Sequence, residues 1–286
     1  MKKKKTVTND KKIMQLEEMS WKQIEELDKS KTILYLPISP LEEHGPHLPV
    51  GTDFIIIKDA VNEAINFLMK KQPDLNYVLL PPIPLGYSKI NLDFPGTISV
   101  SSKVIQDVVY GYGSALANHG FQNMMICTFH MSIFHLKGIY NAMKKLKSRY
   151  NMKLSEPWGP YFHSNMTEER EPKLDFDTSK EVHGGFRETS LMKYQYPYLV
   201  DESYKDLKTT YKDLNSVKIL GKKFKEIGVT EGYVGSPARA DIDYGRWYFK
   251  EIVNVIVSAS LDLYHGKPAP KLPDNIRKIM KIPFIG

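Results

Sequence analysis

Short apolar runs alternate with amphipathic stretches along the first half of the chain, and this alternation limits the possible folds more than any other feature. The apolar runs cover residues 32–38, 77–80 and 123–129, and their lengths suit buried strands. Helical patterns begin at Thr52 or Asp53 and at Ser101 or Ser102, and further ones cover residues 133–150 and 240–264. This order predicts an α/β fold with a mostly parallel central sheet and helices on both faces.

The positive charge of the chain is concentrated at its two ends. The formal net charge is +7, but residues 1–12 carry six lysines against one aspartate and residues 267–286 carry +4, which leaves −2 between them. A nucleic-acid interface interleaves basic and aromatic side chains along one face, so we expect no nucleic-acid partner. No run approaches the roughly 18 apolar residues of a membrane helix, and the single cysteine, Cys127, excludes an internal disulfide. We therefore expect a cytoplasmic protein with no membrane partner.

Residues 42–53, E-E-H-G-P-H-L-P-V-G-T-D, hold three acidic residues and two histidines directly after the first predicted strand. Carboxylate and imidazole groups are the natural ligands of zinc, manganese or iron(II). Glu42 and His44 are two residues apart, so an extended backbone points both to the same side. The prolines and Gly51 can bring Asp53 back toward them. A helix cap at Asp53 beside a solvated loop is the alternative for single residues, but the whole group favours a metal site.

Further loops place polar side chains near the ends of predicted elements. His130 follows the third strand, at the carboxyl edge where parallel sheets bind their ligands. His183 opens H-G-G-F-R-E-T-S, in which Glu188 follows and the two glycines indicate close approach of the backbone to a ligand. Ser88 and Asn91 lie in a loop rich in glycine and proline after the second strand. Other histidines and the cysteine are expected to be structural: His119, His135, His163, His265 and Cys127.

Five motifs occur in the order L-P-I-S-P-L-E-E-H-G-P-H-L-P-V-G-T-D at 36–53, F-P-G-T-I-S at 94–99, His130, H-G-G-F-R-E-T-S at 183–190 and G-Y-V-G-S-P-A-R-A at 232–240. Together they resemble the creatininase (creatinine amidohydrolase) family over about residues 32–245. The resemblance implies an α/β fold, a divalent metal cofactor with one or two ions per chain, and hydrolysis of a small-molecule substrate. It also implies a homo-oligomer, which is a hexamer by family resemblance.

The resemblance also implies roles for single residues. Glu42, Asp53 and His130 match the ligands of one metal ion, and His44 together with a bridging Asp53 matches those of a second. His183 stands where the family has a histidine that contacts substrate and handles protons.

Departures from the family pattern alter the second metal site and the substrate pocket. Ser132 stands where creatininase has a glutamate for the second metal, and a hydroxyl is a poor zinc ligand, so Glu188 is the candidate replacement, with general base as its alternative role. Ser88 occupies a position that contacts substrate in the family. Asn91 replaces a common histidine and Met131 replaces a tyrosine, so these two are further candidates for substrate binding in a pocket that does not reproduce creatininase.

Three interpretations of function follow from the resemblance. In the first, metal-activated water attacks a carbonyl of a small cyclic substrate and breaks the C–N bond of a cyclic amide, with His183 relaying a proton and Glu188 as ligand or base. In the second, the same activation breaks a C–C bond and opens an oxidised inositol ring of the 3-dehydro-scyllo-inosose type. In the third, Ser132 marks a degenerate homologue that binds a metal or ligand without turnover.

The candidate ligands lie far apart in the sequence and must converge on one site, so we expect a single metal hydrolase domain over residues 19–265. Basic tails are expected at residues 1–18 and 266–286. Residues 151–181 are polar and weakly periodic, and they are expected either as a surface excursion or as a variable loop that covers the pocket.

Overall fold

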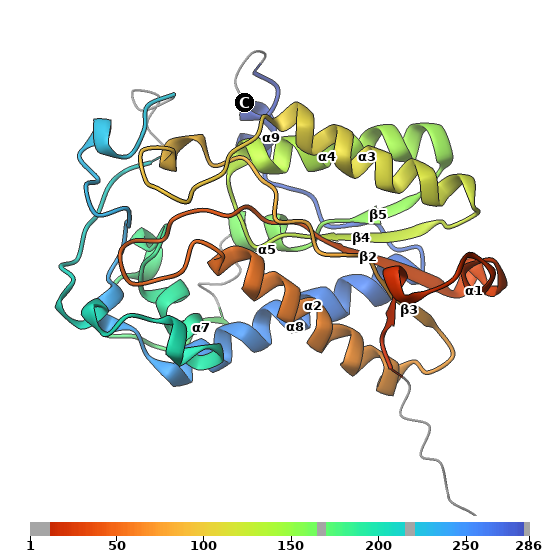
Figure 1. The fold of residues 1–286 in the computed structure, drawn as a ribbon, viewed down its shortest axis with the longest axis horizontal. Coiled ribbons are helices and arrows are strands. Elements are labelled where there is room, and N and C mark those ends of the chain that lie inside the picture. The colour runs from red at the N-terminus through yellow and green to blue at the C-terminus, as the bar shows by residue number, and fades with distance from the viewer. Residues whose placement is uncertain (1–11, 165–169, 215–220, 283–286) are drawn as a thin grey trace, which may run out of the picture.

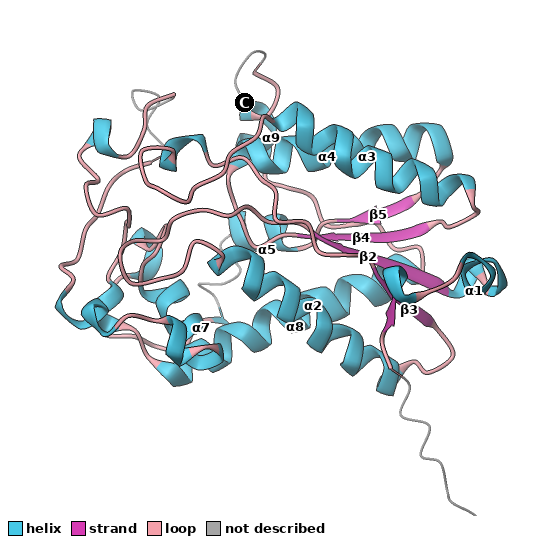
Figure 2. Ribbon diagram, in the orientation of Figure 1, coloured by secondary structure: helices cyan, strands magenta, loops and turns pink. Residues whose placement is uncertain are grey.

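The computed structural model describes residues 12–164, 170–214 and 221–282. Within these ranges a five-stranded sheet, in the order β1-β3-β2-β4-β5, forms the centre of the molecule, and every neighbouring pair of strands is parallel (Figures 1 and 2). The prediction of an α/β fold with a parallel sheet is confirmed. The strands are β1 (Met14–Gln15), β2 (Thr32–Pro37), β3 (Asn76–Leu79), β4 (Asn123–Cys127) and β5 (Lys153–Ser155).

Helices cover both faces of the sheet because alternate side chains of each strand point to opposite sides. The main helices are α2 (Thr52–Lys71), α3 (Ser102–Asn118), α4 (Ile133–Tyr150), α7 (Phe186–Gln195) and α8 (Ile242–Tyr264), and the short ones are α1 (Trp21–Glu26), α5 (Trp158–His163) and α9 (Asp274–Ile279). Ile33 and Tyr35 of β2 belong to one core, with α2, α7 and α8, whereas Leu34 and Leu36 belong to another, with α3 and α4. Figure 1 shows α3 and α4 above the sheet and α2 and α8 below it.

Helix α3 begins at a capping residue that the sequence predicts, whereas α2 begins without a capping side chain. Ser101 caps α3, since its hydroxyl oxygen accepts a hydrogen bond from the Val104 N–H. Helix α2 begins at Thr52, but its cap is Gly51 and no side chain bonds to its first turn. The capping role considered for Asp53 is therefore wrong, because its carboxylate points toward the imidazole of His130 instead.

Both predicted tails lie partly inside the fold. Met14 of β1 pairs with Val78 of β3, so the N-terminal tail boundary at residue 18 is wrong. In the predicted C-terminal tail, Leu272 and Ile276 pack against Leu136 of α4. The apolar side chains at these positions explain both corrections, since Leu272 and Ile276 are buried and Met14 packs partly buried against the core. The predicted tail residues 1–11 and 283–286 lie outside the described residues.

The segment 151–181 begins as regular structure and not as the irregular loop expected from its polarity. Strand β5 extends the sheet beside β4, and α5 follows it directly. Trp158 is 1% exposed, and its ring stacks on Phe129 and Tyr161. The start of the segment is therefore part of the core, and residues 165–169 lie outside the described residues.

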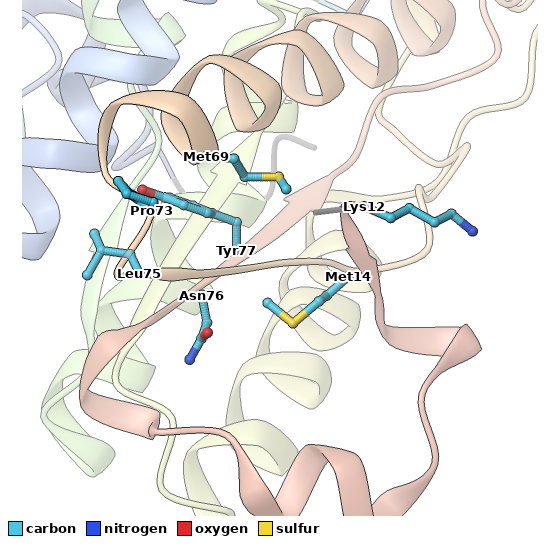
Figure 3. Close-up of a pocket in the computed structure, with 7 residues that line it drawn as sticks. All are labelled: Lys12, Met14, Met69, Pro73, Leu75, Asn76 and Tyr77. Carbon is cyan, nitrogen blue, oxygen red and sulfur yellow. The ribbon is translucent and has the colours of Figure 1, made fainter. Parts of the chain in front are cut away.

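A hollow of about 300 Å³ opens at the amino-terminal ends of the strands, between β1, the end of α2 and β3 (Figure 3). Met14, Met69 and Tyr77 line it. It lies at the opposite end of the sheet from the loops that carry the predicted site. None of the helices in the described ranges combines the length and apolar character that crossing a membrane requires.

Candidate metal centre

The site lies where the three central strands end. Strand β2 is the centre of the sheet, and the chain proceeds from it first to β3 on one side and then to β4 on the other. A parallel sheet opens a crevice at such a reversal, outside the carboxyl ends of the strands. The loop after β2 carries Glu42 and His44, the loop after β4 carries His130, and α7 brings in Glu188 from much later in the sequence.

His130 is the centre of a first group of ligating atoms. Its Nδ1 lies 2.9 Å from Glu42 Oε2 and 3.0 Å from Asp53 Oδ2, and all three residues are buried. Its Nε2 lies 2.8 Å from the Tyr87 carbonyl oxygen. Because a carbonyl only accepts, Nε2 carries the hydrogen and donates it, so the other ring nitrogen faces two carboxylates. That arrangement requires a cation between these atoms, either a proton on Nδ1 or a metal ion.

His44 repeats this arrangement in a second group. Its Nδ1 donates to the Glu42 carbonyl oxygen at 2.8 Å, while its Nε2 faces Asp53 Oδ1 at 3.3 Å and Glu188 Oε2 at 3.8 Å. This Nε2 is buried and has no hydrogen-bond partner among the described residues. Metal-bound histidines characteristically donate their other ring N–H to a carbonyl or carboxylate, and both His44 and His130 do so.

Asp53 connects the two groups. One of its carboxylate oxygens faces His130 and the other faces His44. The ligand atoms of Glu42, Asp53 and His130 lie within 4.8 Å of one another, and so do those of His44, Asp53 and Glu188. The geometry therefore fits the expected metal sets, including the shared Asp53 and the replacement ligand Glu188.

The charges within the cluster shift its pKa values strongly. Burial lowers the pKa of His44, but the carboxylates of Asp53 and Glu188 outweigh this effect and raise it to about 10. Burial raises the pKa of Asp53, but His44 and His130 outweigh it and hold that pKa well below its usual range. The pKa of Glu188 is raised, because burial outweighs the attraction of His44. The carboxylates of the cluster therefore favour positively charged partners, here the protonated histidines. A bound metal ion can take the place of those protons.

His183 lies against this cluster. Its ring is 4.3 Å from that of His44 between centroids, and its Nε2 donates to the Glu43 carbonyl oxygen at 2.6 Å. Its ligating atom also lies within 4.8 Å of those of Glu42 and His44. The side-chain nitrogen of Asn91 lies 3.1 Å from His183 Nε2 and donates to Glu42 Oε1. His183 and Asn91 therefore lie at the candidate metal cluster.

The remaining predicted residues lie less directly in the site. Ser88 is buried, its hydroxyl has no hydrogen-bond partner among the described residues, and it follows Tyr87, whose carbonyl holds His130. Met131 is half-buried and packs against two apolar clusters. Ser132 precedes α4 as its cap residue without a side-chain cap bond. Substrate contacts of Ser88, Asn91 and Met131 stay predictions.

His47 supports the candidate site, although the sequence predicted no role for it. His47 Nε2 lies 2.8 Å from Thr189 Oγ1, so the first loop is joined to α7 beside Glu188. Burial lowers the pKa of His47 to about 4, with a smaller effect from His44 in the same direction. A neutral His47 therefore holds the two ligand-bearing segments together. The only available signal was its place in the segment 42–53, and its partner lies 142 positions away.

Comparison with known proteins identifies the family. The family model for creatininase, described as creatinine amidohydrolase, matches residues 17–260. The chain belongs to the creatininase family. Membership of the creatininase family makes the chain a hydrolase.

Three relatives show how far the sequence similarity extends within the creatininase family. The creatinine amidohydrolase of Pseudomonas putida is 26% identical over 198 residues, which cover 64% of this chain and 72% of that protein. A mycofactocin precursor peptide peptidase of Mycobacterium ulcerans is 34% identical over 87 residues, or 29% and 34% of the two chains. A 3-dehydro-scyllo-inosose hydrolase of Thermotoga maritima is 26% identical over 114 residues, or 39% and 34%.

Solved creatininase structures share the fold. A manganese creatininase superposes with a TM-score of 0.66 at 22% identity, over 88% of this chain and 99% of that one. A mutant creatininase of Zn–Zn type gives a TM-score of 0.66 at 20% identity, over 88% and 99% of the two chains. At this level of identity the comparison supports the α/β fold.

Proposed function

We propose that the chain is a metal-dependent hydrolase that breaks the C–N bond of a cyclic amide by attack of water on its carbonyl carbon. One observation carries the proposal. His44 and His130 each donate one ring N–H to a backbone carbonyl and aim the other nitrogen at carboxylates. This is the pattern of ligands prepared for a metal ion, and two such ligands share Asp53.

The residues fit one or two divalent ions, with zinc, manganese and iron(II) as the candidates. Glu42, Asp53 and His130 would hold one ion, and His44, Asp53 and Glu188 would hold the other. When bound, such ions lower the pKa of water toward about 7 and polarise a carbonyl oxygen. The buried atom His44 Nε2, which lacks a hydrogen-bond partner among the described residues, supports this fit.

The chain's own residues supply orientation and proton transfer. His183 carries a proton on Nε2 beside Glu42 and His44, from where it can protonate a leaving amine. Glu188 completes the second metal set or acts as the general base. Asn91 and Ser88 have buried acceptor atoms without hydrogen-bond partners among the described residues, so both can receive donors from a substrate. Met131 would contribute apolar contact to the same pocket.

A second candidate reaction is the C–C bond cleavage that opens an oxidised inositol ring. The similarity to the 3-dehydro-scyllo-inosose hydrolase of Thermotoga maritima favours it. A carbonyl beside the scissile bond needs the same activation as an amide carbonyl, so the metal set serves both reactions. Asn91, Met131 and Ser132 distinguish this pocket from that of creatininase.

Metal analysis together with a substrate panel tests the proposal. Protein purified without chelator should contain one to two zinc, manganese or iron ions per chain. The panel contains creatinine, another lactam, a formamide, a short peptide and 3-dehydro-scyllo-inosose, and Asp53→Asn serves as the inactive control. Full activity of metal-free protein contradicts the metal mechanism. Tight metal binding without hydrolysis of any compound supports a degenerate binding protein instead.

We also propose that the protein is a cytoplasmic homo-oligomer without a nucleic-acid or membrane partner. The assembly is a hexamer by family resemblance. Light scattering coupled to gel filtration should therefore give a mass about six times the 32.9 kDa of one chain. A monomeric mass at micromolar concentration contradicts this proposal.

A further inference from the structure

Glu181 places a buried carboxylate between two segments next to the proposed site. Glu181 is 5% exposed. One oxygen, Oε2, accepts hydrogen bonds from the Phe186 N–H at 2.7 Å and the Ser236 N–H at 3.0 Å. Phe186 is the first residue of α7, and Ser236 follows the segment that pairs with His183. A single oxygen atom therefore joins the start of α7 to a segment about 50 residues further along the chain.

Two glycines make room for this carboxylate. A Cβ atom at Gly185 or at Gly235 would lie 2.2 Å from Glu181 Oε2, which is far inside contact distance. The two glycines also pack against each other, since a Cβ at Gly235 would lie 2.8 Å from the Gly185 Cα. Close approach of two backbones around one side-chain oxygen requires residues without a side chain. The backbone on both sides is thus shaped around Glu181.

The two residues with proposed chemical roles lie on either side of this junction. His183 forms an antiparallel bridge with Val234, with N···O distances of 3.1 and 2.7 Å. Glu188 lies in the first turn of α7, and its Oε2 accepts the Gly184 N–H at 2.5 Å. Loss of the Glu181 carboxylate would leave two buried N–H groups without an acceptor. The segment that bridges to His183 and the start of α7 would then lose the hydrogen-bond acceptor that they share.

We propose that Glu181 is a positioning residue that fixes His183 and Glu188 relative to each other. The proposal rests on the metal hydrolase function proposed above. Glu181 acts through the backbone of residues 182–188 and 232–236, and it needs two accepting lone pairs, not a charge. An amide oxygen at the same place can accept both hydrogen bonds.

Two variants separate the hydrogen bonds from the charge. Glu181→Ala should raise hydrogen exchange of the peptides covering 182–188 and 232–236 by about tenfold or more, because their amides lose an acceptor. It should weaken Zn²⁺ binding at the site that uses Glu188 by about 10- to 100-fold, as loss of a supporting partner does. It should lower kcat more than it raises KM for the panel compound that the wild type hydrolyses. Glu181→Gln should restore all three properties.

A matched control removes a carboxylate of similar burial elsewhere. Glu156 is 1% exposed and accepts the Gly159 N–H at 2.9 Å. Glu156→Ala should lower the thermal midpoint while leaving exchange at 182–188 and 232–236 unchanged. The proposal is overturned by unchanged exchange in Glu181→Ala, by a glutamine variant as impaired as alanine, or by equal exchange at these segments in Glu156→Ala. Absence of Zn²⁺, Mn²⁺ and Fe²⁺ binding in the wild type would overturn the metal function alone, since the exchange measurements do not need a metal.

Discussion

The geometry around Glu188 favours the role of metal ligand over that of general base. Its carboxylate faces His44 and shares the second ligand set with Asp53, and it also holds the backbone of Gly184. We predict that Glu188→Gln weakens zinc binding at the second site by at least the roughly 10- to 100-fold that outer partners contribute, so that a protein able to hold two ions retains about one. Zinc titration followed by calorimetry measures both quantities.

Ser132→Ala is the matched control for this variant, because Ser132 occupies the position where creatininase has a glutamate ligand. We expect its zinc content to equal that of the wild type. If Glu188→Gln kept full zinc content and lost only activity, Glu188 would be the general base instead of a ligand.

The convergence of four candidate ligands was predictable from the sequence, whereas their roles stay predictions. Glu42, His44, Asp53 and His130 follow strand ends or a predicted helix start, and the structure brings their ligating atoms together. The supporting groups were not predictable, because their partners are backbone atoms or distant side chains. His130 is oriented by the backbone carbonyl of Tyr87, and because every residue has such a group, the sequence does not reveal this contact. His47 likewise depends on Thr189, which only the fold brings near.

At the scale of elements, the contact between α3 and α4 depends on Gly138. A Cβ atom there would lie 2.6 Å from the Ser102 carbonyl oxygen and 2.8 Å from Ile105 Cβ. We predict that Gly138→Ala lowers the free energy of unfolding by about 1–3 kcal/mol, because the helices must separate. Gly111 of α3 is the control, since a Cβ there has nothing within 4 Å. Gly111→Ala should stabilise by up to about 1 kcal/mol through helix propensity, and urea denaturation would measure both. A Gly138→Ala protein as stable as the wild type contradicts the close-packing argument.

The junction between β5 and α5 carries a pH-sensitive carboxyl group. Glu156 Oε1 accepts the Gly159 N–H, and the Tyr140 hydroxyl donates to Oε2 at 3.2 Å. Burial outweighs these bonds and raises the pKa of Glu156 from 4.5 to about 7. The folded state therefore binds this proton more tightly than the unfolded state, so the contribution to stability falls as pH rises from 4.5 through 7.

This pKa shift predicts that Glu156→Gln changes the pH profile of stability. The wild type should lose up to about 3 kcal/mol through this group between pH 4.5 and 7, at 1.36 kcal/mol per pKa unit. The variant lacks that loss, so its advantage over the wild type should grow toward pH 8. Chemical denaturation at pH 5, 6.5 and 8 measures it, with the exposed Glu63→Gln as the control. Parallel profiles of the wild type and Glu156→Gln would rule out this source of pH dependence.

Long elements were predictable and short ones were not, for a physical reason. The ranges of α3 and α4 repeat apolar residues over four or more turns, which is a strong local signal. Strand β1 has two residues and exists because β3 offers it an open edge to pair with. Helix α5 is held in place by Trp158, whose ring also packs against Phe129 after β4 and Tyr248 of α8. Such elements are stabilised by tertiary contacts, which a local pattern does not record.

At the scale of the whole molecule, the candidate site joins segments that are far apart in the sequence. Its ligand sets link the loop after β2, the start of α2, the end of β4 and α7. A metal ion bound there stabilises the native state because the unfolded chain does not hold these groups together. We predict that free zinc at about 1,000 times its Kd adds about 4 kcal/mol. For a chain of this size that raises the thermal midpoint by roughly 10 °C.

The same cluster predicts how the metal-free protein responds to pH. His44 has a pKa of about 10 in the folded state, raised from 6.5 by Asp53 and Glu188 against the effect of burial. A raised histidine pKa gives stability that is complete below 6.5 and is lost as pH rises toward 10. A bound metal ion takes the place of that proton, so the difference in thermal midpoint between zinc-loaded and chelator-treated protein should widen from pH 6.5 to pH 9. Scanning calorimetry at both pH values measures it, and Asp53→Asn should show no zinc effect at either. Equal midpoints with and without zinc at pH 9 would mean that the five candidate ligands form a protonated network and not a zinc centre.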